Sequence, residues 1–224
     1  KLEFLCGQAL ADGAQAIVTV GAAQSNHCRM TAAAGSRLGL EVHLVLAGDA
    51  PAEGERSTGN QLLAEMFGAQ MHHTGAEESH WGELEIAREA LTNQLAEEGL
   101  SPYSIPIGGS TAIGALGYAA GFVELVDQCT DQLITPSTVV FTSSSGGTHA
   151  GLLAGRAALQ AAGQAVPDIV AIGVAKGVVM GLPDIAALAN ATLDLMGLPD
   201  VRVDPADVEV DTRWIGDDYA VPTE

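Results

Sequence analysis

The sequence predicts an α/β fold built from two three-layer α/β/α domains with mainly parallel sheets. Short runs of β-branched and other apolar residues alternate with alanine-rich stretches along the 224 residues. These runs are continuously apolar, which is typical of parallel strands covered on both faces. Apolar residues make up 47% of the chain and the mean hydropathy is +0.23, so a full core can form.

The first half predicts a smaller domain over residues 1–108. Strands are expected at 16–20, 41–46, 70–73 and 105–107, because these runs are short and rich in apolar or β-branched residues. Helices are expected at 26–38, 59–67 and 81–98. A glycine follows each predicted helix, as is common after a last helical turn.

The second half predicts a larger domain over residues 109–224 that is incomplete. Helices are expected at 113–129, after His149 and at 182–195, with strands at 138–142 and 168–173. Beyond Gly197 the sequence is acidic and irregular. The chain starts without methionine, and its last residues resemble the beginning of a further segment. We therefore expect a fragment cut at both ends.

Charge and cysteine content exclude several classes of protein. The formal charge of −19 argues against binding to nucleic acids or anionic membranes. No run of about 18 uncharged apolar residues predicts a membrane-spanning helix. The three cysteines are odd in number and lack CxxC spacing, which argues against a disulfide framework or a zinc site and favours the reducing cytoplasm.

The strongest chemical motif follows the predicted strand at 138–142. Gly146 and Gly147 allow backbone N–H groups to converge, and the helix behind them adds about half a positive charge. The hydroxyls of Ser144, Ser145 and Thr148 are further donors. We interpret the loop as a phosphate or carboxylate cradle; the alternative is a flexible turn that begins a helix. No GK[ST] or GxGxxG motif supports a Walker A loop or a dinucleotide site.

A second polar loop follows the strand at 16–20 and reads Gln24-Ser25-Asn26-His27. Either Ser25 or Asn26 suits the N-cap of the next helix. The same position directs polar groups to the carboxyl end of the strand, where ligands bind in such sheets. Capping alone is the alternative. A nucleophile pair of Cys28 with His27 is disfavoured, because adjacent helical residues do not face each other.

Two further candidates are weaker. The loop at 108–111, Gly-Gly-Ser-Thr, again follows a predicted strand, and it either lines a site or only connects two elements. His72, His73 and His80 lie near Glu77 and Glu78, but their spacing is not that of a metal site. We therefore expect no bound metal.

Three motifs in one order carry a family resemblance over nearly the whole chain. They are Gln24-Ser25-Asn26-His27, then Ile105-Pro106-Ile107-Gly108-Gly109-Ser110 with Gly114-Ala115-Leu116-Gly117-Tyr118, then Ser145-Gly146-Gly147-Thr148-His149-Ala150-Gly151, with Lys1-Leu2-Glu3-Phe4 in front. The chain resembles the D-cysteine desulfhydrase and 1-aminocyclopropane-1-carboxylate deaminase family. The resemblance implies the tryptophan-synthase-β type of fold, fold type II of the enzymes that depend on pyridoxal 5′-phosphate.

The resemblance also implies which residues hold that cofactor. Asn26 would hydrogen-bond the 3′-oxygen of the cofactor ring. The lysine that binds the cofactor covalently would lie just upstream of Lys1, so this fragment alone is expected to be inactive. The cofactor phosphate would be held by Lys1, Ser144, Ser145, Gly146, Gly147 and Thr148.

For the substrate, the resemblance implies two catalytic residues, Ser25 and Tyr219. Ser25 would supply the hydroxyl near the reacting atoms, and Tyr219 would lie beside the substrate. Gln24, His27 and Gly109 would bind the substrate together with Ser25, and backbone N–H groups at the helix start would help hold its carboxylate.

The activity implied is a lyase reaction, the α,β-elimination of D-cysteine to pyruvate, hydrogen sulfide and ammonia. His27 after Ser25-Asn26 favours this branch over the cyclopropane deaminase; an L-cysteate sulfo-lyase is a third option. Outside the family, a phosphate-binding fragment without catalysis and a general α/β nucleotide binder stay open. The expected partners are an amino-acid substrate and a second subunit in a cytoplasmic homodimer, without nucleic acid or membrane.

Overall fold

The computed structural model describes residues 1–77, 80–174 and 185–217. The chain divides into two compact units. The amino-terminal unit consists of Leu2 and Phe4–Gly109, and the carboxy-terminal unit consists of Lys1, Glu3 and Ser110–Glu224. Three expected features lie outside the described residues: Glu78, Tyr219, and the first residues of the helix expected at 182–195.

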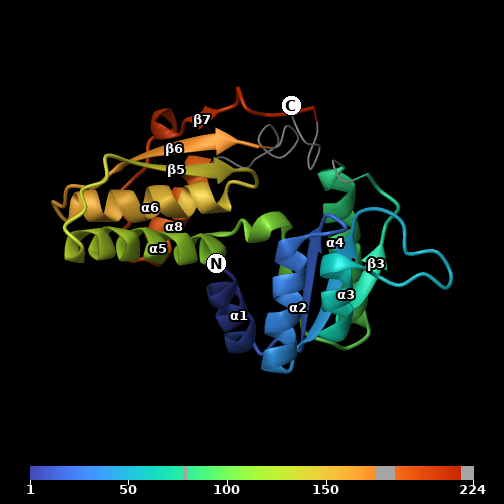
Figure 1. The fold of residues 1–224 in the computed structure, drawn as a ribbon. Coiled ribbons are helices and arrows are strands. Elements are labelled where there is room, and N and C mark those ends of the chain that lie inside the picture. Colours follow the sequence, from blue (N-terminus) through green and yellow to red (C-terminus); the bar gives the residue numbers. More distant parts are fainter. Residues whose placement is uncertain (78–79, 175–184, 218–224) are drawn as a thin grey trace. The chain divides into compact units, whose positions relative to one another are not determined.

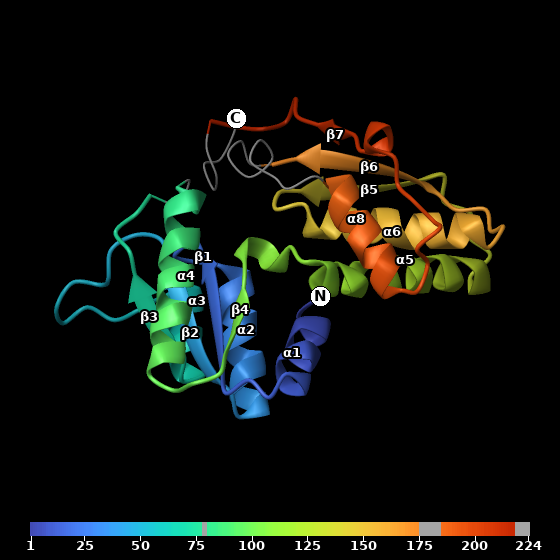
Figure 2. The same cartoon turned by 180° about the vertical axis from the view of Figure 1, so that it is seen from behind.

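The amino-terminal unit is a four-stranded parallel sheet in the order β3-β2-β1-β4 with helices on both faces. Helices α2 and α3 lie on one face and α4 lies on the other (Figure 1 and Figure 2). The elements of this unit are α1 (Leu2–Ala11), β1 (Ala16–Gly21), α2 (Asn26–Leu38), β2 (Glu41–Leu46), α3 (Gly59–Met66), β3 (Gln70–His73), α4 (Trp81–Glu97), β4 (Pro102–Ile105) and the 3-10 turn η1 (Ile107–Gly109).

Alternating side chains of the sheet form two separate cores. Leu44 packs with Ala32 in a cluster on the α2 face, whereas Val45 packs with Val20 and Leu84 in a cluster on the α4 face. All six residues of β1 are buried, because this strand is central and both faces of the sheet are covered.

Two features of this unit differ from the sequence expectation. Helix α1 is absent from the predicted elements; it buries Leu5, Cys6 and Ala9 at helical spacing. The predicted strand at 105–107 is wrong in position, because β4 ends at Ile105. The chain then passes a proline and turns through Gly108 and Gly109, whose φ angles of 62° and 60° favour glycine.

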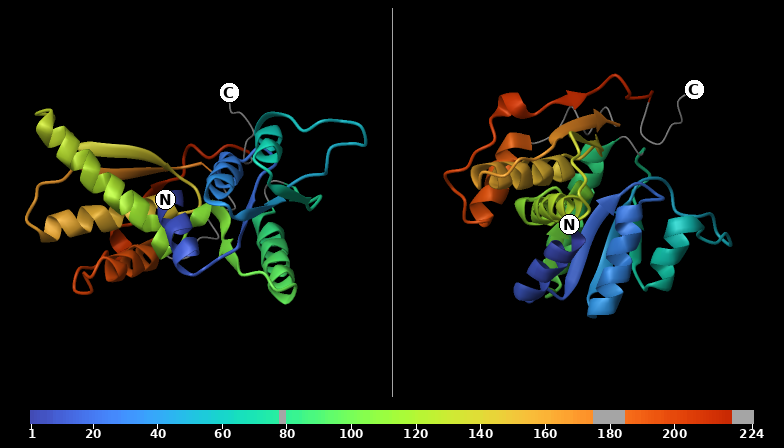
Figure 3. Two further views of the ribbon diagram at one scale, coloured as in Figure 1. Left: turned by 90° about the horizontal axis from the view of Figure 1, so that it is seen from below. Right: turned by 60° about the vertical axis from the view of Figure 1, so that its left-hand side comes forward.

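The carboxy-terminal unit contains a three-stranded parallel sheet in the order β5-β6-β7. Helices α5, α6 and α8 lie on one side of this sheet (Figure 1 and Figure 3). The elements of this unit are α5 (Ala112–Asp131), β5 (Thr138–Ser143), α6 (Gly147–Ala161), β6 (Asp168–Gly173), α8 (Ile185–Leu195), the 3-10 turn η2 (Pro205–Asp207) and β7 (Val210–Asp211).

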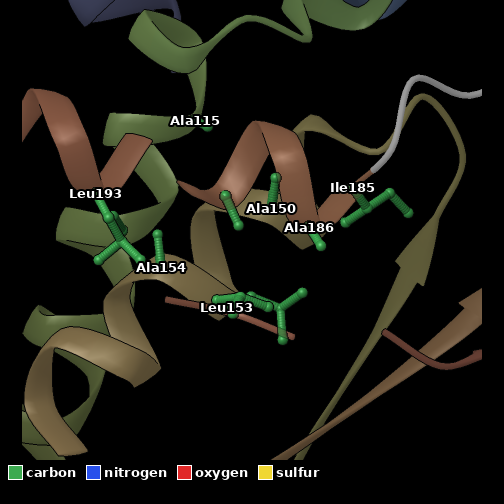
Figure 4. Packing of buried hydrophobic residues seen from close by; sticks show 10 residues of the cluster. Ala115, Ala150, Leu153, Ala154, Ile185, Ala186 and Leu193 are labelled. Atoms are coloured by element: carbon green, nitrogen blue, oxygen red, sulfur yellow. The ribbon is translucent and has the colours of Figure 1, made fainter. Parts of the chain in front are cut away.

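Small residues bring α5, α6 and α8 close together. Figure 4 shows alanines of all three helices, among them Ala115, Ala150 and Ala186, meeting Leu153, Ile185 and Leu193 in one cluster. The α5–α6 contact also needs glycine. A Cβ atom at Gly155 would lie 2.7 Å from the carbonyl oxygen of Ala119.

Two expectations for this unit are corrected. Helix α6 begins at Gly147 and not after His149, because Gly146 adopts the left-handed conformation (φ 81°) and turns the chain into the helix three residues earlier. The segment beyond Gly197 is not wholly irregular, since Val210 and Asp211 form β7 and pair with β6.

Candidate functional site

The loop after β1 is held by the N-cap of α2. The Ser25 side chain accepts a hydrogen bond from the Cys28 backbone N–H at 3.1 Å. A Cβ atom at Gly21 would lie 2.7 Å from both Ser25 Oγ and Cys28 Sγ, so the loop requires glycine where it leaves the strand. Because Ser25 Oγ accepts at the cap, its own proton is available for a ligand atom.

The side chains of Gln24 and Asn26 are both tied to the start of α3. Gln24 Oε1 accepts the Asn60 N–H at 2.8 Å, and Gln24 Nε2 donates to Thr58 O at 3.2 Å. Asn60 Nδ2 in turn donates to Gln24 O at 2.8 Å and to Asn26 Oδ1 at 3.1 Å. This arrangement assigns the Asn26 amide orientation, since its oxygen accepts from Asn60 and its Nδ2 group stays a donor.

His27 is anchored to the sheet beneath it, whereas Cys28 is buried. His27 Nε2 lies 2.8 Å from the hydroxyl of Thr19 on β1. Burial raises the pKa of the Cys28 thiol to about 11, and its side chain is 3% exposed. A thiol with that pKa is protonated at neutral pH, so the structure argues against the alternative of a nucleophilic Cys28 activated by His27.

The turn that carries Gly109 is held by a partly buried ion pair on α4. Glu85 Oε1 accepts the Ile107 N–H at 2.5 Å, and Glu85 Oε2 pairs with Arg88 Nε at 2.6 Å. Arg88 also hydrogen-bonds Ser104 on β4. The Gly109 N–H donates to Pro106 O at 2.8 Å, so this amide is used within the turn.

The start of α6 in the carboxy-terminal unit presents backbone donors without a side-chain cap of its own. The Gly147 N–H donates to Ser110 Oγ at 3.2 Å, and Ser110 Oγ donates to Ser145 Oγ at 2.8 Å. Within the described part of the chain, the N–H groups of Thr148 and His149 have no acceptor. Two helix N-terminal donors therefore remain for an external anion.

Lys1 adds a cation at the same place. A Cβ atom at Gly147 would lie 2.9 Å from Ser110 Oγ and 3.2 Å from Lys1 Nζ, so a side chain there would fill the space between them. Lys1 Nζ also lies over the Tyr118 ring, 5.2 Å from its centroid. Burial lowers the pKa of Lys1 to about 8, which leaves much of its charge at neutral pH.

The buried residues next to this cradle contribute no negative charge. Ser143 Oγ is buried and has no hydrogen-bond partner among the described residues. His149 packs edge-on against Phe141 with ring centroids 5.2 Å apart, and burial lowers its pKa to about 4. His149 is therefore neutral at pH 7. Ammonium, amide and hydroxyl donors together suit the oxygens of a phosphate dianion.

The structure thus places the expected site residues in two groups. Lys1, Ser145, Gly146 and Gly147 meet at the start of α6, with Ser144 and Thr148 in the same junction of β5 and α6. Gln24, Ser25, Asn26, His27 and Gly109 lie at the carboxyl ends of β1 and β4 in the amino-terminal unit. Five polar residues that the motifs did not assign a role also contribute: Thr19, Asn60, Glu85, Arg88 and Ser110.

The described residues offer neither a metal site nor a membrane span. No group of three or more His, Cys, Asp or Glu side chains is placed to hold a metal ion there. In the same residues, no helix has the length and apolar character needed to cross a bilayer.

Comparison with known proteins points to one family. A family model described as pyridoxal-phosphate dependent enzyme matches residues 1–224. The D-cysteine desulfhydrases of Salmonella typhi and Salmonella paratyphi B are each 40% identical to the chain over 178 residues, which cover 78% of this chain and 50% of theirs. The chain therefore spans about half the length of the curated relatives it matches.

Solved structures agree on the fold. A crystal structure of an ACC deaminase homologue superimposes with a TM-score of 0.76 at 35% identity, covering 92% of this chain and 58% of that chain. A crystal structure of T.th. threonine deaminase superimposes with a TM-score of 0.54 at 21% identity, covering 76% of this chain and 48% of that one. Both confirm the expected fold type II architecture.

Proposed function

We propose a function for a chain that belongs to the family of pyridoxal-phosphate-dependent enzymes. The proposed reaction is the α,β-elimination of D-cysteine. D-cysteine and one water give pyruvate, hydrogen sulfide and ammonia. The α C–H, Cβ–S and Cα–N bonds break, water supplies the keto oxygen of pyruvate, and no oxidant is needed. The observation that carries the proposal is the start of α6, where two backbone N–H groups that lack an acceptor among the described residues lie close to Lys1.

The donor set at the start of α6 fits the phosphate group of pyridoxal 5′-phosphate. We propose that the N–H groups of Thr148 and His149 and the ammonium of Lys1 hold its oxygens, with the hydroxyls of Ser110, Ser144 and Ser145 beside them. When bound, the cofactor supplies an electron sink that stabilises negative charge at the substrate α-carbon. The helix start and a half-buried lysine offset the field of a chain whose net charge is −19.

In the amino-terminal unit, we assign the ring and substrate contacts to the loop after β1. Asn26 is proposed to donate from Nδ2 to the 3′-oxygen of the cofactor ring, which its orientation toward Asn60 supports. Ser25 is the proposed catalytic hydroxyl, because its proton is not used by the helix cap. His27 is proposed to contact the substrate through its side chain, and Gln24 through its backbone N–H, since its amide is tied to α3.

Gly109 and Tyr219 complete the proposed substrate contacts. The Glu85–Arg88 pair supports the role of Gly109, because it fixes the turn that Gly109 ends. The role of Tyr219 rests on the family resemblance alone.

The choice of D-cysteine rests on the relatives named D-cysteine desulfhydrase at 40% identity. The deamination of 1-aminocyclopropane-1-carboxylate is the alternative, which the structural neighbour at 35% identity favours. Removal of sulfite from L-cysteate is the third. All three reactions place negative charge on the substrate α-carbon, by loss of the α-proton or by opening of the cyclopropane ring, and all three need the same phosphate cradle. The cradle therefore does not separate them.

A substrate panel on the complete protein with pyridoxal 5′-phosphate tests the proposal. D-cysteine, L-cysteate, D-serine and the cyclopropane acid are scored for sulfide, sulfite, pyruvate and 2-oxobutanoate. We expect equal amounts of sulfide and pyruvate from D-cysteine at the highest kcat/KM of the panel. Preferential release of 2-oxobutanoate or sulfite would replace D-cysteine by the matching alternative. Binding of the cofactor without turnover of any substrate would reject the enzymatic function.

We also propose that the complete protein is a cytoplasmic homodimer. The three cysteines support the location, because all are free thiols and two, Cys6 and Cys28, are buried, as suits a reducing compartment. The dimer rests on the family resemblance. Sedimentation equilibrium at micromolar concentration tests it, and a single species of monomer mass would contradict it.

A further inference from the structure

The hydrogen bond between Thr19 and His27 determines which ring nitrogen of His27 carries the proton. Thr19 lies on β1 and is fully buried, and its hydroxyl is 3.0 Å from the carbonyl oxygen of Ile105. The same hydroxyl is 2.8 Å from Nε2 of His27. Ile105 is also fully buried, so water does not take part at that oxygen.

A proton count decides the direction of both hydrogen bonds. A hydroxyl has one proton to donate, and a carbonyl oxygen only accepts. The proton of Thr19 therefore goes to Ile105, and Nε2 of His27 must bring its own proton to the Thr19 oxygen. The opposite assignment would leave two acceptor oxygens facing each other at 3.0 Å in a buried place, which is unfavourable.

We infer that Thr19 is a positioning residue that holds His27 as the Nε2–H tautomer. In the neutral imidazole the lone pair then lies on Nδ1, so Nδ1 is the atom at which His27 accepts a proton or a hydrogen bond. Thr19 does not contact the substrate in this assignment. It acts through His27 by setting the tautomer and the plane of the ring.

The surroundings of His27 keep its backbone fixed while Thr19 fixes its ring. His27 follows the N-cap Ser25 by two residues, and its own carbonyl oxygen accepts the hydroxyl of Thr31 at 2.9 Å. The role of Nδ1 toward a substrate rests on the proposed function. The tautomer itself rests only on the contacts of Thr19.

The tautomer is measurable without turnover. Nitrogen NMR of the histidine rings in the complete protein, with the His27 signals assigned from a His27→Gln variant, distinguishes protonated from unprotonated ring nitrogens. We expect a protonated Nε2 and an unprotonated Nδ1 for neutral His27. In Thr19→Val, which lacks the acceptor oxygen, the two nitrogens should average toward a mixture. Thr19→Ser should restore the wild-type pattern.

A matched control and a kinetic readout complete the test. Thr31→Val removes another buried threonine hydroxyl, which contacts the backbone of His27 and not its ring, and it should leave the His27 tautomer unchanged. In turnover, Thr19→Val should lower kcat/KM by about tenfold, the factor of one lost hydrogen bond, and Thr19→Ser should recover most of it. The inference is overturned by an Nδ1–H tautomer in the wild type, or by a Thr19→Val variant with unchanged tautomer. Absence of turnover on every amino acid would instead reject the proposed function, while the spectrum still decides the tautomer.

Discussion

Replacing Gly147 by alanine tests the cradle at the start of α6 most sharply. The new Cβ atom would lie 2.9 Å from the Cα and Oγ atoms of Ser110 and 3.2 Å from Lys1 Nζ. Contacts this short force Ser110 or Lys1 away, at a cost of about 1–3 kcal/mol for overpacking. If that cost falls on cofactor binding, the Kd for pyridoxal 5′-phosphate rises roughly 5- to 150-fold.

The assay is a calorimetric titration of the complete protein with the cofactor. Gly121→Ala is the matched control, because Gly121 is also helical, lies in the same unit and has open space around the position of an added Cβ atom. That variant should bind the cofactor as the wild type does and gain about 0.5–1 kcal/mol of stability. A Gly147→Ala protein that is folded and binds the cofactor within about twofold of the wild type would refute the cradle, because overpacking predicts a larger change.

Three further predictions concern catalysis and stability. Ser25→Gly should reduce turnover at least tenfold, because it removes the proposed catalytic hydroxyl, but it should lower the free energy of unfolding by only a few tenths of a kcal/mol. Ser25→Ala should reduce turnover as well and should also lose about 1 kcal/mol of helix capping. An unchanged kcat in Ser25→Gly would reject the catalytic role of Ser25. Burial lowers the pKa of His149 from 6.5 to about 4, so below about pH 6.5 the unfolded chain binds a proton that the folded chain takes up only near pH 4. The contribution of His149 to the free energy of unfolding should therefore be complete above pH 6.5 and should be lost as the pH falls toward 4, by about 3 kcal/mol. In denaturant titrations, the free energy of unfolding of His149→Leu should fall less over this range, by that amount. An equal fall in both proteins would show that His149 is not the group. Gly151→Ala should lower thermal stability, because its Cβ atom collides with the carbonyl oxygen of Ala115 across the α5–α6 contact; a midpoint equal to that of the wild type would contradict the packing.

Local signals in the sequence are sufficient for the elements with clear ends. The helix expected at 26–38 is α2, because Ser25 caps its start and Gly39, with φ 73°, ends it. The strand expected at 41–46 is β2, whose short apolar run is covered on both faces. In both cases the decisive interactions lie within a few residues of the element, and sequence patterns report such interactions well.

Elements that depend on contacts with distant parts of the chain are not predicted by local sequence patterns. Helix α1 has Gly7 inside it and only three buried side chains, so its apolar pattern is short. Strand β7 is two residues long and exists through its pairing with β6, an element well before it in the chain. Neither feature has a cap or a repeating pattern that the sequence alone displays.

The same difference holds for the candidate site. The motifs identify the loop at 144–148 and the loop at 24–27, because glycines and hydroxyl residues follow predicted strands there. The supporting residues come from elsewhere: Ser110 reaches Gly147 from 37 residues away, and Asn60 reaches Asn26 from 34. A sequence signal exists for Ser110, which directly follows Gly108-Gly109, but none distinguishes Asn60 or Thr19.

The proposed function depends on a phosphate dianion being held by the N–H groups of Thr148 and His149 at the start of α6 together with Lys1. Amide NMR of the complete protein during a titration with inorganic phosphate tests this directly. We predict saturable shifts centred on the N–H groups of Thr148 and His149, with a weaker affinity in Lys1→Gln. Signals of these two residues that stay unmoved at saturating phosphate, or shifts of equal size in Lys1→Gln at the same affinity, would contradict it.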